Sequence, residues 1–251
     1  MPDCRSVVEL DNVSLTRGEN TVFSSFSWQV RSGEHWFVMG NNGCGKTSLM
    51  EIIMAYVWPQ SGSVRVLDEL YGNTFIQDVR RRIGYVSPWI FRRTDVDTPV
   101  CNVVASGIDG SVRYVGALPA NLLARVAAKL EFFGCEELVN RPFGQLSSGQ
   151  QFKVILSRAL INDPELLLLD EPFAQLDIGA RMRAYDLVEQ LIGRTSAPAV
   201  ILVTHHLEDI TASYTHGLLF KDSSTRFAAS RERILTNEMF SDVFGIRRIL
   251  F

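Results

Sequence analysis

The sequence GNNGCGKT at residues 40–47 decides the fold, because it matches the spacing G-x-x-x-x-G-K-T. Its three glycines allow the backbone to curl without Cβ clashes, so that successive N–H groups can point at the oxygens of a phosphate. Lys46 can neutralise phosphate charge, and Thr47 offers a hydroxyl to Mg²⁺. The motif therefore predicts a nucleotide phosphate site made of Gly40, Asn41, Asn42, Gly43, Cys44, Gly45, Lys46, Thr47 and Ser48.

The sequence on either side of this loop supports the interpretation. The apolar run His35–Met39 is typical of a buried strand, and a helical pattern extends from Thr47 to about Val57, ended by Pro59. A helix that begins at the loop directs the positive end of its dipole at the same phosphate. We therefore favour a phosphate-binding loop over an ordinary Gly-rich turn.

A second motif, LLLLDEP at residues 166–172, supplies two carboxylates. Four consecutive leucines are typical of a strand that is buried on both faces in a parallel sheet. Asp170 then emerges at the carboxyl end of the strand, where open α/β sheets bind ligands and where an Asp can hold Mg²⁺. Glu171 can accept a proton from an attacking water. Beside the phosphate loop, this reading is favoured over a buried strand that ends in a solvated acidic turn.

Strand and helix patterns alternate along the rest of the chain. Apolar residues alternate between residues 7 and 30, which predicts an antiparallel meander, and residues 61–89 resemble further short strands. Residues from about 90 to 145 are rich in Ala and Leu at helical spacing. Strand-like runs return at 166–169 and 199–203 with a helical pattern between them, so we expect βαβ units and a parallel sheet.

Composition excludes several classes of protein. The 251 residues include 25 Lys and Arg against 28 Asp and Glu, so the charge of −3 gives no global reason to bind nucleic acid. The longest apolar run, Ile52–Trp58, has seven residues, whereas a membrane span needs about 20. The N-terminus has no long apolar segment typical of a signal peptide. The four cysteines lack C-x-x-C spacing, and we interpret them as reduced thiols in a cytosol.

Three further motifs place the chain near a known family. The segment LSSGQQ at 146–151 lies 24 residues before Asp170 and resembles the LSGGQ signature of the ABC-type ATPases. Residues 174–177, AQLD, resemble that family's D-loop, and Val203-Thr204-His205 resembles its switch-histidine motif. The resemblance covers essentially the whole chain. The segments GEHWFVMG, VASGIDGSV, THHLEDI and THGLLF also resemble a single-cassette branch described as molybdenum-transport-related or photorepair-related.

The resemblance implies the fold. It implies an α/β P-loop NTPase with a mixed, mainly parallel core sheet, an N-terminal antiparallel β subdomain and a helical insertion. Residues 1–251 would form one ABC ATPase domain. Residues 1–89 and 146–251 would make the core, and residues from about 90 to 145 would make a helical signature subdomain.

The resemblance also implies roles for individual residues. ATP and Mg²⁺ would bind at the phosphate loop, with Thr47 and Asp170 as metal ligands. Glu171 would activate water, and His205 would hold the γ-phosphate and that water. The signature and the D-loop would contact ATP bound to a second copy, which implies a head-to-tail homodimer around two ATP. The residues that would act on the partner's nucleotide are Ser147, Ser148, Gly149, Gln150 and Asp177.

Two positions depart from the family pattern. Arg17 stands where an aromatic residue usually stacks on adenine, and a planar guanidinium can cover a purine face in its place. The alternative is a solvated turn arginine. The segment IGYVSPWI carries Ser87 and Pro88 where the family usually has Pro-Gln, so Ser87 is a candidate Mg²⁺ ligand.

Two functions fit this pattern. The first is the nucleotide-binding subunit of an ABC transporter, cytoplasmic and peripheral on the inner face of the membrane, docked on a separate membrane permease. The second is a soluble ABC ATPase that acts on nucleic acid or a ribosome. We favour the first function. Soluble ABC ATPases usually carry a second cassette or a long coiled-coil insertion, which these 251 residues do not show, and no basic stripe indicates nucleic acid. The signature and the D-loop argue against a P-loop kinase.

Overall fold

The structure is a computed structural model that describes residues 5–111, 113–222 and 226–245. Contacts divide the chain into two compact units. The first contains residues up to Ile76 and from Ala199 onward, and the second contains Gln77–Pro198. The division at about 90 and 145, expected from the sequence, stays a prediction.

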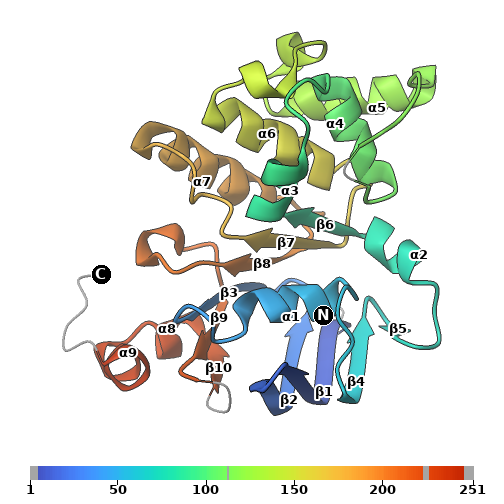
Figure 1. Cartoon of the computed structure of the whole chain (residues 1–251). Coiled ribbons are helices and arrows are strands. Elements are labelled where there is room, and N and C mark those ends of the chain that lie inside the picture. Colours follow the sequence, from blue (N-terminus) through green and yellow to red (C-terminus); the bar gives the residue numbers. More distant parts are fainter. Residues whose placement is uncertain (1–4, 112, 223–225, 246–251) are drawn as a thin grey trace. The chain divides into compact units, whose positions relative to one another are not determined.

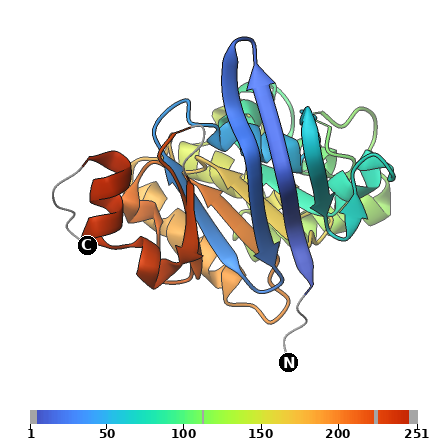
Figure 2. The ribbon, with the colours of Figure 1, turned by 90° about the horizontal axis from the view of Figure 1, so that it is seen from below.

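The first unit contains an antiparallel sheet in the order β2-β1-β4-β5. Strands β1 (Ser6–Arg17) and β2 (Asn20–Arg31) form a long hairpin, and β4 (Ser61–Val66) and β5 (Glu69–Leu70) continue the sheet (Figure 2). Val8, Val13 and Val30 are fully buried, as the alternation of apolar and polar residues predicts. The antiparallel β subdomain is therefore confirmed.

The first unit also contains the strands that lead to the phosphate loop. Strand β3 (His35–Gly40) lies parallel to both β8 (Ala199–Val203) and β9 (His216–Phe220), and β10 (Arg226–Ser230) pairs with β9 in the antiparallel sense. Every residue of β3 and β8 is buried, which is typical of strands covered on both faces. With a parallel pair in the second unit, the core strands are mainly parallel, as expected.

Helix α1 (Lys46–Ile53) follows the phosphate loop and is shorter than the sequence suggests. We expected it to continue to about Val57, but Ala55 has φ 52°, in the left-handed region, so the helix cannot propagate through it. The described part of this unit also contains the helical segments η4 (Leu207–Asp209), α8 (Arg231–Ile234) and α9 (Asn237–Phe244).

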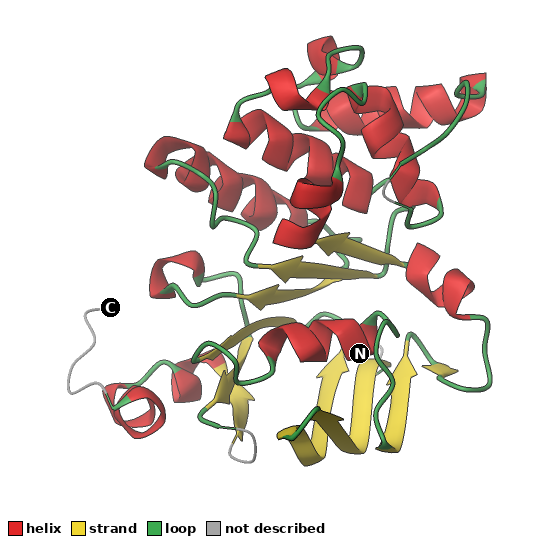
Figure 3. Ribbon diagram, in the orientation of Figure 1, coloured by secondary structure: helices red, strands yellow, loops and turns green. Residues whose placement is uncertain are grey.

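The second unit contains the parallel strands β6 (Ile83–Val86) and β7 (Leu166–Asp170) and a group of helices (Figures 1 and 3). The longest helices are α5 (Ala120–Phe132), α6 (Ser148–Ala159) and α7 (Ile178–Ile192). The shorter ones are α3 (Pro88–Arg93), α4 (Val100–Ala105), η1 (Ser106–Ile108), η2 (Glu136–Leu138) and η3 (Phe143–Gln145). Helix α2 (Ile76–Arg81) begins at the unit boundary.

The expectation of short strands throughout 61–89 is wrong at two places, where α2 and the start of α3 occur. Each of these helices has six residues, which is too short to produce a recognisable helical period. The helical character of 90–145 holds: Leu122, Val126 and Leu130 form the buried stripe of α5. Arg158 of α6 is buried and donates to Ser106 Oγ at 3.1 Å, which joins α6 to η1.

In the described part of the chain, helices are too short or too polar to cross a bilayer.

Candidate nucleotide-binding site

The phosphate loop adopts the conformation that its glycines permit. Gly43 and Gly45 have φ of 81° and 108°, which a residue with a Cβ rarely adopts. A Cβ added to Gly40 would lie 2.6 Å from Phe220 Cβ and 2.7 Å from Cys44 Sγ, closer than side chains approach one another. The loop therefore lies tightly against β9, and substitution at these glycines would displace it.

Lys46 is held inside the loop that precedes it. Its side chain is only 6% exposed, and its Nζ donates to the carbonyl oxygens of Gly40 at 2.7 Å and Asn41 at 3.0 Å. Gly45 is the N-cap of α1, and Thr47 is exposed on the first turn of that helix. The ammonium group and the helix N-terminus thus belong to one loop, and both favour an anion there.

Arg17 ends β1 and forms an ion pair with Glu51 of α1. The Arg17 side chain is 45% exposed and that of Glu51 is 28% exposed. The pair links the tip of the β1–β2 hairpin to the helix that begins at the phosphate loop. Sequence analysis did not foresee this partner, because residues 34 positions apart carry no local signal of contact.

Asp170 and Glu171 lie where the LLLLDEP motif suggests. The four leucines of β7 are fully buried, and Asp170 at the end of the strand is 6% exposed. Glu171 follows with φ 46°, a left-handed conformation that is unfavourable for a residue with a long side chain. Among the described residues six others that are not glycine, Ala55 and Asp163 among them, also have positive φ, so this conformation alone does not mark Glu171 as a functional residue.

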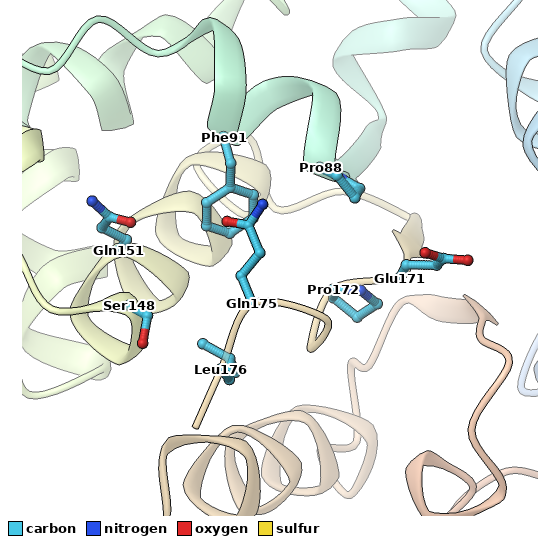
Figure 4. A pocket seen from close by; sticks show the side chains of 8 residues that line it. All are labelled: Pro88, Phe91, Ser148, Gln151, Glu171, Pro172, Gln175 and Leu176. Atoms are coloured by element: carbon cyan, nitrogen blue, oxygen red, sulfur yellow. The ribbon is translucent and has the colours of Figure 1, made fainter. Parts of the chain in front are cut away.

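Glu171 also borders a narrow pocket within the second unit (Figure 4). The pocket joins the end of β7 to the start of α3, the first turns of α6 and the segment before α7. Its lining residues are Pro88, Phe91, Ser148, Gln151, Glu171, Pro172, Gln175 and Leu176. A residue of the signature segment, Ser148, therefore lines the same pocket as the acidic residue that follows the buried strand.

The signature segment forms the N-terminus of α6, as expected. Ser147 is the N-cap: its hydroxyl accepts from Gln150 N at 3.3 Å, while Gln150 Oε1 accepts from Ser147 N at 3.0 Å. This capping box fixes the first turn of the helix. A Cβ on Gly149 would lie 3.2 Å from Ala180 Cβ, so glycine permits the close approach of α6 and α7. Asp177 caps α7 by accepting from Ala180 N at 2.8 Å.

Ser87 lies in the turn between β6 and α3. Its hydroxyl is fully buried and, among the described residues, has no hydrogen-bond partner. Pro88 is the first residue of α3, a position that suits its fixed φ and missing N–H. Ser87 as an Mg²⁺ ligand stays a prediction.

His205 follows β8 in a turn that is held by its neighbours. The hydroxyl of Thr204 donates to the buried carboxylate of Asp209 and accepts from His206 N at 3.0 Å. The Thr204 N–H donates to Val38 O at 3.1 Å, which ties the turn to β3. His205 is exposed, and its ring centroid lies 4.0 Å from that of His206. The contact with Asp209, five residues on, was not foreseen from the sequence.

The candidate residues are thus divided between the two units. The first unit carries Arg17, the phosphate loop and His205, and the second carries Ser87, Asp170, Glu171, the signature segment and Asp177. Each unit also presents the N-terminus of a helix beside small or Gly residues, at α1 and at α6. The chain therefore has two separate local structures that favour anions.

Comparison with known proteins identifies the family. A family model described as ABC transporter matches residues 23–174. The uncharacterized ABC transporter ATP-binding protein YlmA of Bacillus subtilis (strain 168) is 31% identical over 239 residues, covering 95% of this chain and 90% of that protein. The ABC transporter ATP-binding protein ModF of Escherichia coli (strain K12) is 32% identical over 216 residues, covering 85% of this chain and 44% of that protein.

A solved structure gives the same result for the fold. The dimeric, post-hydrolysis ATP-binding cassette MJ0796 bound to ADP and Pi has a TM-score of 0.73 and 24% identity, and covers 89% of this chain and 98% of that one. The fold is that of an ABC-type P-loop ATPase. The chain belongs to the ABC transporter family and is an ATP-binding ATPase of that family. The resemblance drawn from the signature is confirmed, and the roles of single residues stay predictions.

Proposed function

We propose that this chain is the ATP-hydrolysing subunit of an ABC transporter, and that two copies associate head to tail around two ATP to drive a separate membrane permease. The observation that carries this proposal is the capping box at the start of α6. The capping box fixes the first turn of α6, and a helix N-terminus favours anions through its dipole and its remaining N–H groups. This helix start lies in a different unit from the phosphate loop, which supports its acting on a second nucleotide, bound to the partner copy.

In this proposal the phosphate loop binds the β- and γ-phosphates of ATP. Its N–H groups and the start of α1 supply donors, and Lys46 supplies a fixed cation. The burial of Lys46 and its contacts with the Gly40 and Asn41 carbonyls support this role, because they hold the ammonium group at the loop. Arg17 covers the adenine ring from the hairpin tip.

The donor set also suits Mg²⁺. Thr47 offers an exposed hydroxyl and Asp170 a buried carboxylate, and hard oxygen ligands of these two kinds are those that Mg²⁺ takes together with substrate phosphates. When bound, Mg²⁺ neutralises charge on the β- and γ-phosphates. We propose these two residues as its protein ligands.

We propose Glu171 as the general base that accepts a proton from the attacking water. Its position directly after Asp170, at the carboxyl end of the buried strand β7, supports this role. His205 holds the γ-phosphate and that water. The Thr204–Asp209 hydrogen bond supports the second role by fixing the turn from which His205 projects.

The signature residues and Asp177 act on the nucleotide of the partner copy. Ser147, Ser148, Gly149 and Gln150 lie on the first turn of α6, and Asp177 lies before α7. The Gly149–Ala180 approach brings the starts of these two helices together within one unit, which supports their acting as one surface. A head-to-tail homodimer then uses the same surface twice.

We place the chain at the cytoplasmic face of a membrane, bound to a permease, because relatives carry the description ABC transporter ATP-binding protein. The deciding experiment is co-expression with an adjacent gene that encodes a polytopic membrane protein. Purification of both as one complex, with ATP hydrolysis altered in the complex, supports the transporter role. Hydrolysis by the chain alone that responds instead to RNA or ribosomes would favour the second function.

A further inference from the structure

Arg226 opens strand β10 and lies among three phenylalanine rings. Its Cζ is 4.8 Å from the ring centroid of Phe23, 4.9 Å from that of Phe26 and 4.9 Å from that of Phe220. The rings also contact one another, with centroids 5.3 Å apart for Phe23 and Phe26. A cation that faces three rings in a partly buried place is held more firmly than one at an exposed ring.

The same guanidinium is anchored to the backbone of a distant strand. Arg226 Nη2 donates to Val22 O at 2.7 Å, which joins β10 to β2 across 204 residues of sequence. Its Nε is buried and lacks a hydrogen-bond partner among the described residues. Arg226 thus clamps the β1–β2 hairpin to the pair β9–β10.

The residues that Arg226 holds are those against which the phosphate loop packs. A Cβ on Gly45 would lie 2.8 Å from Val22 Cγ1 and 3.3 Å from the Phe23 ring. At the other end of the loop, a Cβ on Gly40 would lie 2.6 Å from Phe220 Cβ. One end of the loop therefore packs against Phe220, and the other packs against Val22 and Phe23. Arg226 contacts both phenylalanine rings and donates a hydrogen bond to the Val22 carbonyl.

We propose that Arg226 is a positioning residue for the phosphate loop: it fixes the wall of Val22, Phe23 and Phe220 behind the loop and adds a fixed positive charge beside it. The proposal rests on the proposed function only for the identity of the ligand, ATP. Arg226 acts through these residues and through its charge, and it touches no nucleotide in this proposal.

Cys44 of the loop provides a reporter for that charge. Burial raises the pKa of the Cys44 thiol, while the positive charges of Lys46 and Arg226 lower it. Lys46 Nζ lies 3.9 Å from Cys44 Sγ. Removal of the Arg226 charge should therefore raise the pKa of Cys44 further and move the pH midpoint of its alkylation upward.

The test uses Arg226→Met, which keeps an apolar stem and removes the charge and the donors, and Arg226→Lys, which keeps the charge. Arg233→Met is the matched control, since Arg233 is exposed on α8. Two quantities are measured for each full-length protein: the dissociation constant for ATP, and the rate of iodoacetamide alkylation of the Cys44 peptide against pH without nucleotide. Thermal melting records stability separately.

We expect Arg226→Met to weaken ATP binding by about fivefold, within the range for residues that act on a site through packed neighbours, and to raise the midpoint for Cys44. Arg226→Lys should restore the midpoint and part of the affinity, and the control should match the wild type. An Arg226→Met protein that only melts earlier, with both other quantities unchanged, would overturn the proposal. If the wild type fails to bind ATP while the midpoint still shifts, the proposed function is wrong but the placement of Arg226 is supported.

Discussion

Replacing Arg17 with alanine or tyrosine tests whether this arginine covers adenine. The Ala variant loses two contacts, the ion pair with Glu51 and the proposed stacking on the base. The ion pair is partly exposed, and pairs of that kind contribute about 0.2–1 kcal/mol to stability. Arg17→Ala should therefore lower the melting temperature by no more than about 2–4 °C, the shift that about 1 kcal/mol produces in a chain of this size.

The effect on ATP should be separable from that loss. A cation–π contact contributes about 1 kcal/mol, so Arg17→Ala should weaken ATP binding about fivefold. Arg17→Tyr should restore most of the affinity through its own ring, although it cannot restore the ion pair. Equilibrium binding of ATP, measured by calorimetry on all three proteins, gives the comparison.

Glu51→Gln is the matched control, because it removes the ion pair and leaves the guanidinium in place. It should reproduce the small loss of stability while ATP affinity stays within about twofold of the wild type. Equal ATP affinity for wild type, Ala and Tyr would show that Arg17 is a surface residue and that adenine is held elsewhere. If Glu51→Gln weakens binding as much as Arg17→Ala, the ion pair and not the stacking accounts for the effect.

Substitutions at three other positions test the phosphate loop, the proposed base and the signature. Lys46→Ala should abolish ATP binding, because the phosphates lose their fixed cation; unchanged affinity would contradict the assignment of the loop. Glu171→Gln should keep ATP binding while the rate of hydrolysis falls by about 10²-fold or more. The protein should then accumulate as an ATP-bound dimer on a sizing column, and a monomer alone would count against the homodimer. Ser147→Arg should remove hydrolysis but not ATP binding by the monomer, and loss of ATP binding in this variant would argue against action on the partner's nucleotide. Ser147→Ala loses only the helix cap and should lower the free energy of unfolding by about 1 kcal/mol.

Much of the fold could be predicted because long elements carry strong periodic signals. The alternation before residue 30 and the stripe of α5 exceed the length at which strand and helix patterns differ, whereas β7 has only five residues and was predicted from its run of leucines before two acids. Helices α2 and α3 were missed because six residues make fewer than two turns. The early end of α1 was missed because its left-handed residue is Ala55, where sequence rules expect Gly or Asn.

In the candidate site, too, some features could be predicted from the sequence and others could not. The phosphate loop, the two acids and the signature could be found because their residues are close in sequence and their spacing is imposed by local backbone geometry. The contact of Thr204 with Asp209 depends on the path of the turn after β8, and those of Arg17 with Glu51 and of Arg226 with three rings depend on how distant segments pair in the fold. A single sequence gives no measure of such pairing, so these contacts become visible only in the folded chain.

The left-handed backbone of Glu171 has a consequence for how this chain would change over generations. A non-glycine residue in that region costs about 1–3 kcal/mol, and glycine adopts it without steric strain. Substitutions to Gly or Asn at this position would ease folding while removing the acid proposed to activate water. A lineage selected only for a stable, abundant protein would therefore drift away from Glu at 171, so its retention in a relative is a sign that hydrolysis is still under selection there.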